Sequence, residues 1–227
     1  MVRLQTPPSA ILKSKLLAEI EAEATEEILK VAKVKRYLSR HTIVTGGDPA
    51  VELFLLQMGR ARYYRLTRSG REILIGWLLP GDAFGLGSLL NEPLTYMGTA
   101  EAMRPCEALC WNHEQIKDLA KKYPQIAENG LRIVLHHLKS YLDRHIGLIT
   151  KNSQERLAAT LIHLANKAGR SHASGVEIDA TNEQLSGLAD ISQFTASRLL
   201  SGWERLGAIS KKRGRVIVHS PETFISD

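Results

Sequence analysis

The sequence predicts an α+β chain in which a region of short strands, a long helix and a small C-terminal domain follow one another. Three observations predict this order. Short apolar runs broken by turn residues fill residues 37–112, a helical period holds over residues 124–150, and two short helices followed by a basic hairpin end the chain. The 227 residues are 44% hydrophobic and 24% charged, as in ordinary globular proteins.

Composition narrows the class of protein. No run of 18 apolar residues occurs, and the first ten residues lack the apolar core of a secretory signal, so we expect a cytoplasmic protein without membrane contact. The two cysteines, Cys106 and Cys110, form neither a disulfide framework nor a structural metal site, and we expect no metal or other cofactor. The net charge of +6 and the five basic residues between Arg205 and Arg215, where no acidic residue occurs, favour a nucleic-acid partner.

The N-terminal region predicts a helix and then a sandwich or barrel of strands. Residues 11–34 have apolar positions near the helical period. Four short apolar runs follow, separated by clusters of Gly, Pro, Asp and Asn: Val51–Met58, Ala61–Leu66, Ile73–Leu78 and Ala108–Trp111. A spacing of four puts Cys106 and Cys110 on one face of the last strand.

Residues 124–150 predict one helix with two adjacent apolar stripes. The first stripe runs through Ile126, Gly130, Val134, either His137 or Leu138, Tyr141, His145 and Leu148. The second runs through Leu131, Leu135, Leu142 and Ile149. Two apolar faces exceed what one domain edge covers, so we expect this helix to pair with its copy in a homodimer. The alternative is a helix packed only on its own barrel.

The segment after this helix predicts a helix-turn-helix. Residues 151–153 form a polar hinge, residues 155–168 a further amphipathic helix, and residues 169–175 a polar loop. Thr181 and Gln184 have the spacing of a capping box, and Ser192 can cap a second helix that ends near Leu206. The start of such a helix contacts DNA, so we expect contacts from Ser192, Gln193, Phe194, Thr195, Ser197 and Arg198. Arg198 suits guanine, Gln193 suits adenine, and Ser192 and Thr195 suit phosphates.

A basic hairpin follows this second helix. Residues 208–210 and 216–218 are short apolar strands, and the tip between them carries four cations that we expect to contact phosphates: Lys211, Lys212, Arg213 and Arg215. Together the hairpin and the two helices predict a winged helix-turn-helix that binds double-stranded DNA at an inverted repeat. The alternative is a small helical subdomain with a solvated run of charge.

The order of these motifs resembles the catabolite activator and fumarate-nitrate regulator (CRP/FNR) family of transcription regulators over nearly the whole chain. The matching segments are residues 46–48, 53–60, 80–85, 123–126, 156–158, 161–165 and 195–200. The resemblance implies a β-roll sensor of the cyclic-nucleotide-binding type (residues 1–123), a dimerisation helix (124–150) and a winged helix-turn-helix (151–227). It also implies allosteric control by an effector bound where the roll meets the helix.

Two departures from this family bear on the ligand and on the operator. Cyclic-nucleotide binders of the family have a Glu for the ribose and an Arg for the phosphate, whereas this chain has Leu86 and no arginine in residues 96–99. We therefore expect an effector other than cyclic AMP. The resemblance places its site at Gly85, Leu86, Gly87, Ser88, Met97, Gly98, Thr99, His137 and Tyr141. Phe194 replaces a Glu that accepts from cytosine, so the usual half-site of the family is not expected in full.

Other functions stay open at this stage. The roll can be a scaffold in a ligand-independent DNA binder, or the chain can be a heme or gas sensor that uses His41, His113, His136, His137 or His145. An N-terminal iron–sulfur cluster is excluded, because no cysteine precedes Cys106, which is expected in the core. No nucleophile elbow, phosphate-binding loop or dinucleotide fingerprint occurs, so an enzyme is not expected. RNA polymerase is a further candidate partner.

Overall fold

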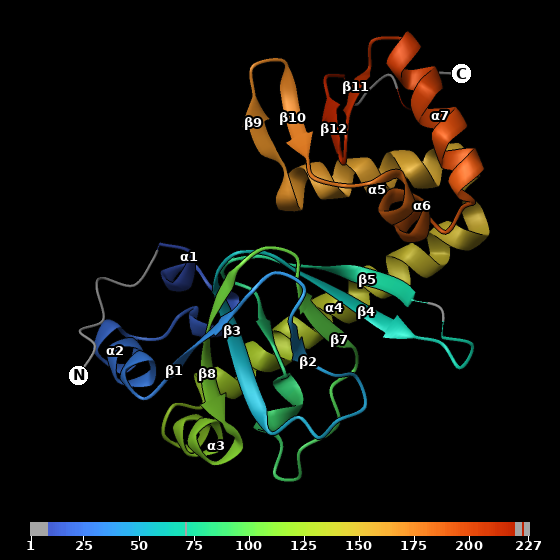
Figure 1. Cartoon of the computed structure of the whole chain (residues 1–227). Coiled ribbons are helices and arrows are strands. Elements are labelled where there is room, and N and C mark those ends of the chain that lie inside the picture. Colours follow the sequence, from blue (N-terminus) through green and yellow to red (C-terminus); the bar gives the residue numbers. More distant parts are fainter. Residues whose placement is uncertain (1–8, 71, 221–223, 225–227) are drawn as a thin grey trace. The chain divides into compact units, whose positions relative to one another are not determined.

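The computed structural model describes residues 9–70, 72–220 and 224 of the chain (Figure 1). It divides into two compact units, residues 1–139 and residues 140–227. Within the described part, no helix is both long and apolar enough to cross a membrane.

The first unit is built on two four-stranded antiparallel sheets (Figure 1). One sheet has the order β1 (Lys33–Tyr37), β8 (Cys106–Asn112), β3 (Glu52–Met58) and β6 (Ala83–Phe84). The other has the order β2 (Thr42–Val44), β7 (Thr99–Ala102), β4 (Ala61–Leu66) and β5 (Glu72–Leu78). This arrangement confirms the predicted β-roll, and the four predicted strands appear as β3, β4, β5 and β8.

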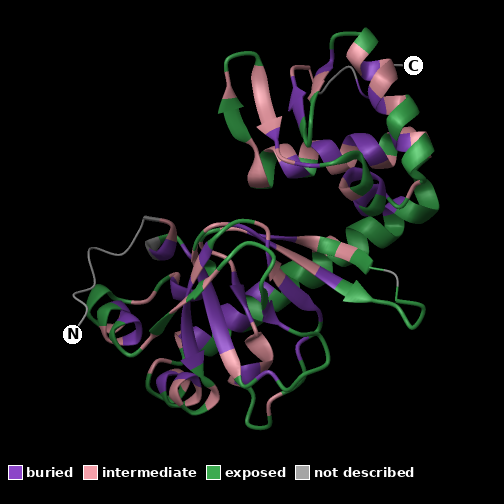
Figure 2. Cartoon of the chain, in the orientation of Figure 1, coloured by how far each residue is buried: buried purple, intermediate pink, exposed green. Residues whose placement is uncertain are grey.

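Both faces of strand β3 are buried, because the strand lies between two apolar clusters (Figure 2). Phe54 and Leu56 point into the roll, where they pack with residues of the other sheet and with both cysteines. Leu53 and Leu55 point the other way, into a cluster that the helices cover. The alternation of side chains along a strand produces this division. The expected core position of Cys106 is confirmed, since it is buried with Cys110 in the roll interior.

The prediction of one helix over residues 11–34 is wrong. The segment forms α1 (Ser9–Leu12), a 3-10 turn η1 (Lys15–Leu17) and α2 (Ala22–Lys30), and β1 then begins at Lys33. Ser14 caps the 3-10 turn, and Glu19 takes a left-handed φ of 60° that no helix continues through. The breaks allow Leu16, Leu17, Ile28 and Leu29 to reach the same apolar cluster on the outer face of the sheet.

Helix α3 (His113–Lys122) leads into α4 (Gln125–Thr150), which confirms the predicted long helix. The face of α4 that carries Ile126, Asn129 and Ile133 is buried against its own roll. A Cβ added at Gly130 would lie 2.6 Å from Leu89 Cδ1 of the turn η2 (Leu86–Leu89), so this position also faces the roll. Ile126 and Gly130 of the first predicted stripe therefore pack inside the chain, whereas Val134, Leu138, Tyr141 and Leu148 of the same stripe are exposed.

The second unit is a winged helix. It contains α5 (Ser153–Ala168), α6 (Asn182–Ala189), α7 (Gln193–Arg205) and an antiparallel sheet of the order β11 (Ile209–Lys212), β12 (Arg215–Val218), β10 (Gly175–Ile178) and β9 (Arg170–His172). The polar loop predicted over residues 169–175 is wrong, because β9 and the first residue of β10 occupy it. The sequence signal there is weak, since β10 gains its partner β12 from 40 residues further along the chain. Phe224 is buried in the core of this unit, where the centroid of its ring lies 4.6 Å from the centroid of the Trp203 ring.

Candidate nucleic-acid interface and sensor roll

Local bonds that the sequence predicts cap the start of α6 and the start of α7. Thr181 Oγ1 accepts from the Gln184 amide and Gln184 Oε1 accepts from the Thr181 amide, which completes the capping box of α6. Asp190 ends α6 in a left-handed conformation with a φ of 50°. At α7, the Ser192 hydroxyl accepts from the Thr195 amide at 3.0 Å. These caps satisfy helix ends that would otherwise lack partners.

Arg156 holds the turn between α6 and α7 in place, a role that the sequence reasoning missed. Its guanidinium donates to the carbonyl oxygens of Ala189 (3.1 Å) and Asp190 (3.3 Å) at the end of α6. It also donates to the Lys151 carbonyl at 2.8 Å. One side chain of α5 thus joins the start of its own helix to the turn that orients α7.

Helix α7 has one buried face and one exposed face. Ala196, Leu200 and Trp203 are buried in the core of the second unit. Five of the six residues expected at DNA in this region are exposed: Ser192, Gln193, Phe194, Ser197 and Arg198. Thr195 is half-buried, and its hydroxyl oxygen lies 2.8 Å from that of Ser192, within hydrogen-bond distance. Within the described residues, the guanidinium of Arg198 makes no ion pair, so its donors are available to a ligand.

The four cations of the hairpin are not equivalent. Lys211 Nζ lies 3.0 Å from Glu204 Oε2 and 2.9 Å from Ser201 Oγ, both on α7. The hydrogen bond from Lys211 lowers the pKa of Glu204, so this carboxylate stays charged beside the lysine. Arg215 pairs with Asp179 at 3.0 Å and with Glu177 at 3.4 Å. Lys212 and Arg213 are exposed and have no ion pair with any residue that the structure describes.

A stripe of large apolar side chains on α4 is exposed. Its members are Leu131, Val134, Leu135, Leu138, Tyr141, Leu142, Ile146, Leu148 and Ile149. Five of them lie on one line of alternating steps of four and three residues: Leu131, Leu135, Leu138, Leu142 and Ile149. His145 occupies the step between Leu142 and Ile149. At about 100° per residue, this line lies on the opposite side of the helix from Ile126, Asn129 and Ile133. The structure thus separates a face packed on the roll from a second apolar face that none of the described residues covers.

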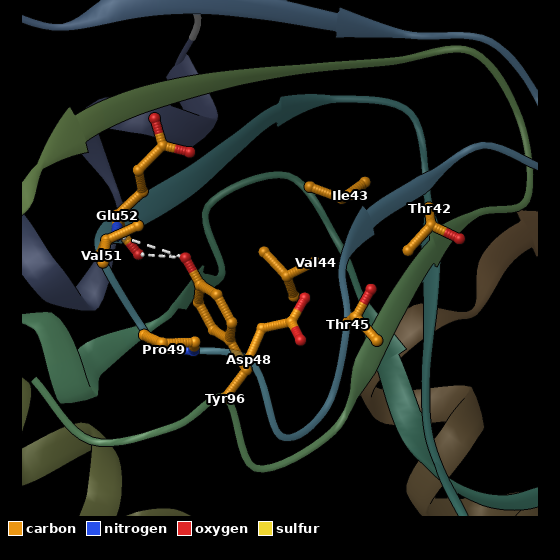
Figure 3. A pocket seen from close by; sticks show the side chains of 9 residues that line it. All are labelled: Thr42, Ile43, Val44, Thr45, Asp48, Pro49, Val51, Glu52 and Tyr96. Carbon is orange, nitrogen blue, oxygen red and sulfur yellow. Dashed lines mark hydrogen bonds between the residues drawn. The ribbon is translucent and has the colours of Figure 1, made fainter.

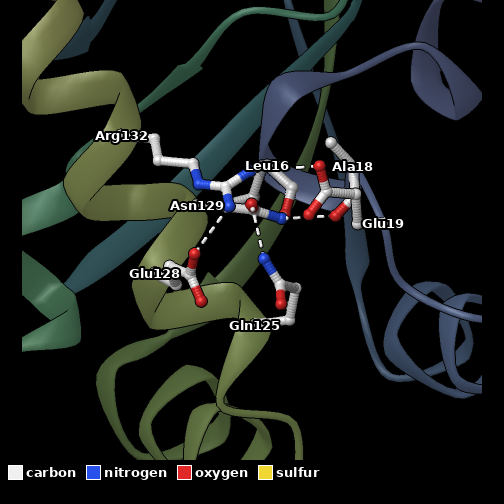
Figure 4. Close-up of polar contacts among 7 residues, drawn as sticks. All are labelled: Leu16, Ala18, Glu19, Gln125, Glu128, Asn129 and Arg132. Atoms are coloured by element: carbon white, nitrogen blue, oxygen red, sulfur yellow. Dashed lines mark hydrogen bonds and ion pairs between the residues drawn. The ribbon is translucent and has the colours of Figure 1, made fainter.

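Polar contacts anchor the roll-facing side of α4 to the N-terminal segment (Figure 4). The buried amide of Asn129 donates to the carbonyl oxygens of Leu16 (3.0 Å) and Ala18 (2.7 Å). Arg132 pairs with Glu19 at 3.2 Å and with Glu128 at 2.7 Å. Because these contacts fix the orientation of α4 on the roll, they also fix which face of the helix is left exposed.

The residues expected to hold an effector differ in exposure, and three of the nine are buried: Ser88, Gly98 and Thr99. Gly85, Leu86, Gly87 and Ser88 lie at the turn η2, where Gly85 has a φ of 80° and Ser88 is fully buried. Thr99 is also buried, and its hydroxyl accepts from the Gly46 amide at 3.0 Å. Met97 points to solvent, and His137 is exposed on α4. Tyr141 is exposed as well and belongs to the second unit.

Tyr63 fills the space beside Gly98, which the sequence reasoning missed. A Cβ added at Gly98 would lie 2.9 Å from Tyr63 Cζ, and the Gly98 backbone hydrogen-bonds the Tyr63 hydroxyl. The ring packs on the apolar interior of the roll, and burial raises the pKa of Tyr63, so the hydroxyl stays neutral. An aromatic ring therefore lies directly against Gly98, one of the residues that the resemblance places at an effector.

A separate shallow pocket of about 500 Å³ lies at one end of the roll (Figure 3). Its lining residues are Thr42, Ile43, Val44, Thr45, Asp48, Pro49, Val51, Glu52 and Tyr96, none of which was expected at an effector. The Tyr96 hydroxyl donates to the Glu52 carbonyl at 3.1 Å and accepts from the Glu52 amide at 3.2 Å. Lys35 neutralises the Glu52 carboxylate at 2.6 Å. Within the described residues, no group of three or more His, Cys, Asp or Glu is placed to hold a metal ion.

Comparison with known proteins identifies both units. Residues 34–123 match the family model of the cyclic nucleotide-binding domain, and residues 155–225 match that of the Crp-like helix-turn-helix domain. The chain belongs to the CRP/FNR family. It is thus a DNA-binding transcription regulator by family, which confirms the resemblance and the fold class, and its relatives are regulators rather than enzymes.

The similarity to individual CRP/FNR regulators is distant and nearly full-length. Electron transport regulator A of Shewanella oneidensis is 26% identical over 178 residues, which cover 78% of this chain and 70% of that protein. The CRP-like cAMP-activated global transcriptional regulator of Mycobacterium tuberculosis is 23% identical over 205 residues, 89% of this chain and 91% of the relative.

Among solved CRP/FNR structures, the c-di-GMP responsive global regulator CLP of Xanthomonas campestris matches with a TM-score of 0.75 at 21% identity, covering 88% of this chain and 99% of CLP. FixK2 from Bradyrhizobium japonicum matches with a TM-score of 0.73, also at 21% identity, covering 86% of this chain and 96% of FixK2. At this identity the two matches establish the fold alone.

Proposed function

We propose that this CRP/FNR regulator acts as a homodimer that binds an inverted repeat in double-stranded DNA. The observation that carries the proposal is the exposed apolar stripe of α4, which alternates in steps of four and three residues. This spacing is typical of a two-stranded coiled coil, in which the same face of a second copy covers the stripe. The stripe lies away from the contacts that hold α4 to its own roll, so pairing requires no rearrangement of the first unit.

In such a dimer each α7 contacts one half-site. We propose that Arg198 donates two bonds to a guanine and that Gln193 contacts an adenine, while Ser192, Thr195 and Ser197 contact the backbone or neighbouring bases. Lys212 and Arg213 at the tip of the hairpin contact phosphates. Two recognition helices related by a two-fold axis require half-sites about 10–10.5 base pairs apart, centre to centre.

We further propose that the roll does not respond to a cyclic nucleotide. Two observations support this proposal: Leu86 stands where family members have the ribose-binding Glu, and the Tyr63 ring packs beside Gly98. The partly buried Tyr63 ring packs beside Gly98, which favours a second candidate function over control by another effector at that position. In this second candidate, the roll is a dimer scaffold and DNA binding is independent of ligand.

Sedimentation and DNA binding test the proposal together. At micromolar concentration the protein should sediment as a dimer, near twice 25.2 kDa. Selection from random DNA should enrich an inverted repeat, and gel-shift titration should show that the dimer prefers it over scrambled DNA. A monomer that binds a single half-site would refute the dimer, and equal affinity for both DNAs would refute sequence-specific binding. A selected site that binds tightly without any added small molecule would support the ligand-independent form.

A further inference from the structure

We infer that the Phe194 ring contacts the C5-methyl group of a pyrimidine in the major groove. The base that faces this side chain in each half-site is therefore thymine or 5-methylcytosine. The inference rests on the proposed DNA-binding function and adds to it the chemistry of one base contact. It also predicts that cytosine methylation at this base pair changes the affinity of the regulator.

The first observation is the position of the Phe194 ring. Phe194 is the second residue of α7, and its side chain is 79% exposed. The apolar residues further along the helix, Ala196, Leu200 and Trp203, form the buried face. The Phe194 ring therefore adds little to the core of its own unit, and it lies in the first turn of the helix, which approaches base edges most closely.

The second observation is the chemistry around the ring. Arg198 follows Phe194 by four residues, so the two side chains lie on the same face of α7. Gln193 and Ser197 complete this exposed face, and the same unit carries Lys212 and Arg213, which have no acidic partner among the described residues. A single aromatic ring among cationic and polar groups suits the groove of a polyanion better than the apolar core of a protein interface.

A phenyl ring has neither a donor nor an acceptor, so it can distinguish base pairs in the groove only through their apolar groups. Thymine is the standard base that presents a methyl group there, and 5-methylcytosine presents a methyl at the same ring position. Four residues of helix span about 6 Å at about 1.5 Å per residue, while base pairs rise about 3.4 Å. The methyl group should therefore lie about one or two base pairs from the guanine that faces Arg198.

Single-atom changes in the DNA test this contact. The full-length protein is titrated against the selected operator in which each thymine of the half-site is replaced in turn by uracil, cytosine or 5-methylcytosine. At one thymine, uracil should weaken binding about fourfold per half-site, because burial of one methyl contributes about 0.8 kcal/mol. At the same position, 5-methylcytosine should bind more tightly than cytosine by a similar factor.

Protein variants assign the effect to Phe194. Phe194→Ala should bind the thymine and uracil operators equally, and Phe194→Glu should prefer cytosine, whose N4 amino group donates to a carboxylate. Leu206→Ala is the matched control, because Leu206 is 71% exposed at the far end of the same helix and should leave the dependence on the methyl group intact.

Two results would overturn the inference: the wild type binding the uracil and thymine operators equally at every position, or Phe194→Ala retaining the preference for thymine. If binding stays sequence-specific and dependent on Arg198 in either case, only the methyl contact is wrong. If no DNA sequence is preferred at all, the proposed function is wrong as well.

Discussion

Replacement of single cations in the hairpin provides a quantitative test of how this regulator contacts DNA. The structure divides the four cations into two classes. Lys212 and Arg213 have no acidic partner among the described residues, whereas Lys211 pairs with Glu204 and Arg215 pairs with Asp179 and Glu177. We expect Lys212→Ala or Arg213→Ala to remove one phosphate contact from each hairpin, and thus two from the dimer.

The size of the effect follows from counterion release. Each phosphate contact contributes about −0.9 to the slope of log K against log salt concentration, so the loss of two contacts should reduce the slope by about 1.8. When the salt concentration rises from about 50 to 200 mM, the wild type should lose affinity by a factor about ten times larger than the factor by which the variant loses affinity. The loss should be similar on the operator and on scrambled DNA, since phosphates carry no sequence information.

The matched control removes the Lys211–Glu204 pair as a unit. Lys211→Met combined with Glu204→Gln leaves the net charge unchanged, and the glutamine retains the oxygen that accepts from the Lys211 amide at 2.9 Å. If Lys211 is occupied by Glu204, this double variant should keep the wild-type slope. Fluorescence anisotropy at four salt concentrations on both DNAs measures these slopes. A double variant that lowers the slope as much as Lys212→Ala would refute the division into two classes, and so would an unchanged slope in both single variants.

The remaining predictions concern base recognition, the dimer, the turn and the ligand. Arg198→Ala should weaken the binding free energy on the selected operator by roughly 1–3 kcal/mol and relax the base preference at one base pair per half-site. If gel shift shows an equal loss of affinity on scrambled DNA, Arg198 contacts a phosphate instead. Leu138→Glu should dissociate the dimer in sedimentation while circular dichroism stays unchanged, because the side chain is half-exposed in the single chain and a buried charge would lack a partner. Arg156→Ala should lower the free energy of unfolding of the winged helix by about 1–3 kcal/mol in urea melts, since three hydrogen bonds to carbonyl oxygens are lost. Arg156→Lys should restore only part of this stability. An unchanged free energy of unfolding in Arg156→Ala would contradict its role at the turn. Calorimetry should detect no micromolar binding of cyclic AMP to the wild type, and such binding would show that Tyr63 leaves room for a nucleotide.

The sequence by itself determined the elements whose signals are local. The capping box of Thr181 and Gln184, the Ser192 cap and the helical period of residues 124–150 all act within a few residues of the chain, and each appears where it was expected. The ordered set of short motifs likewise determined the family. Local bonds of this kind form in the same way in almost any tertiary setting, which is why they can be predicted without one.

The tertiary structure decided which of the available surfaces are used. Residues 11–34 have a helical period, yet packing on the outer face of the sheet that contains β3 and β8, together with the left-handed Glu19, divides the segment into short helices. Strand β10 pairs with β12, and Tyr63 meets Gly98, 35 positions further along the chain, so neither contact has a local signature.

The same holds for the two functional surfaces. Periodicity alone placed two apolar stripes on the central helix, but the packing of Ile126 and Ile133 on the roll and the hydrogen bonds of Asn129 decide which side belongs to the roll and which side is left exposed. Four basic residues at the hairpin look alike in the sequence, and the carboxylates of Glu204 and Asp179 neutralise two of them. In each case the deciding energy comes from groups that are distant along the chain, so it emerges only when the fold brings them together.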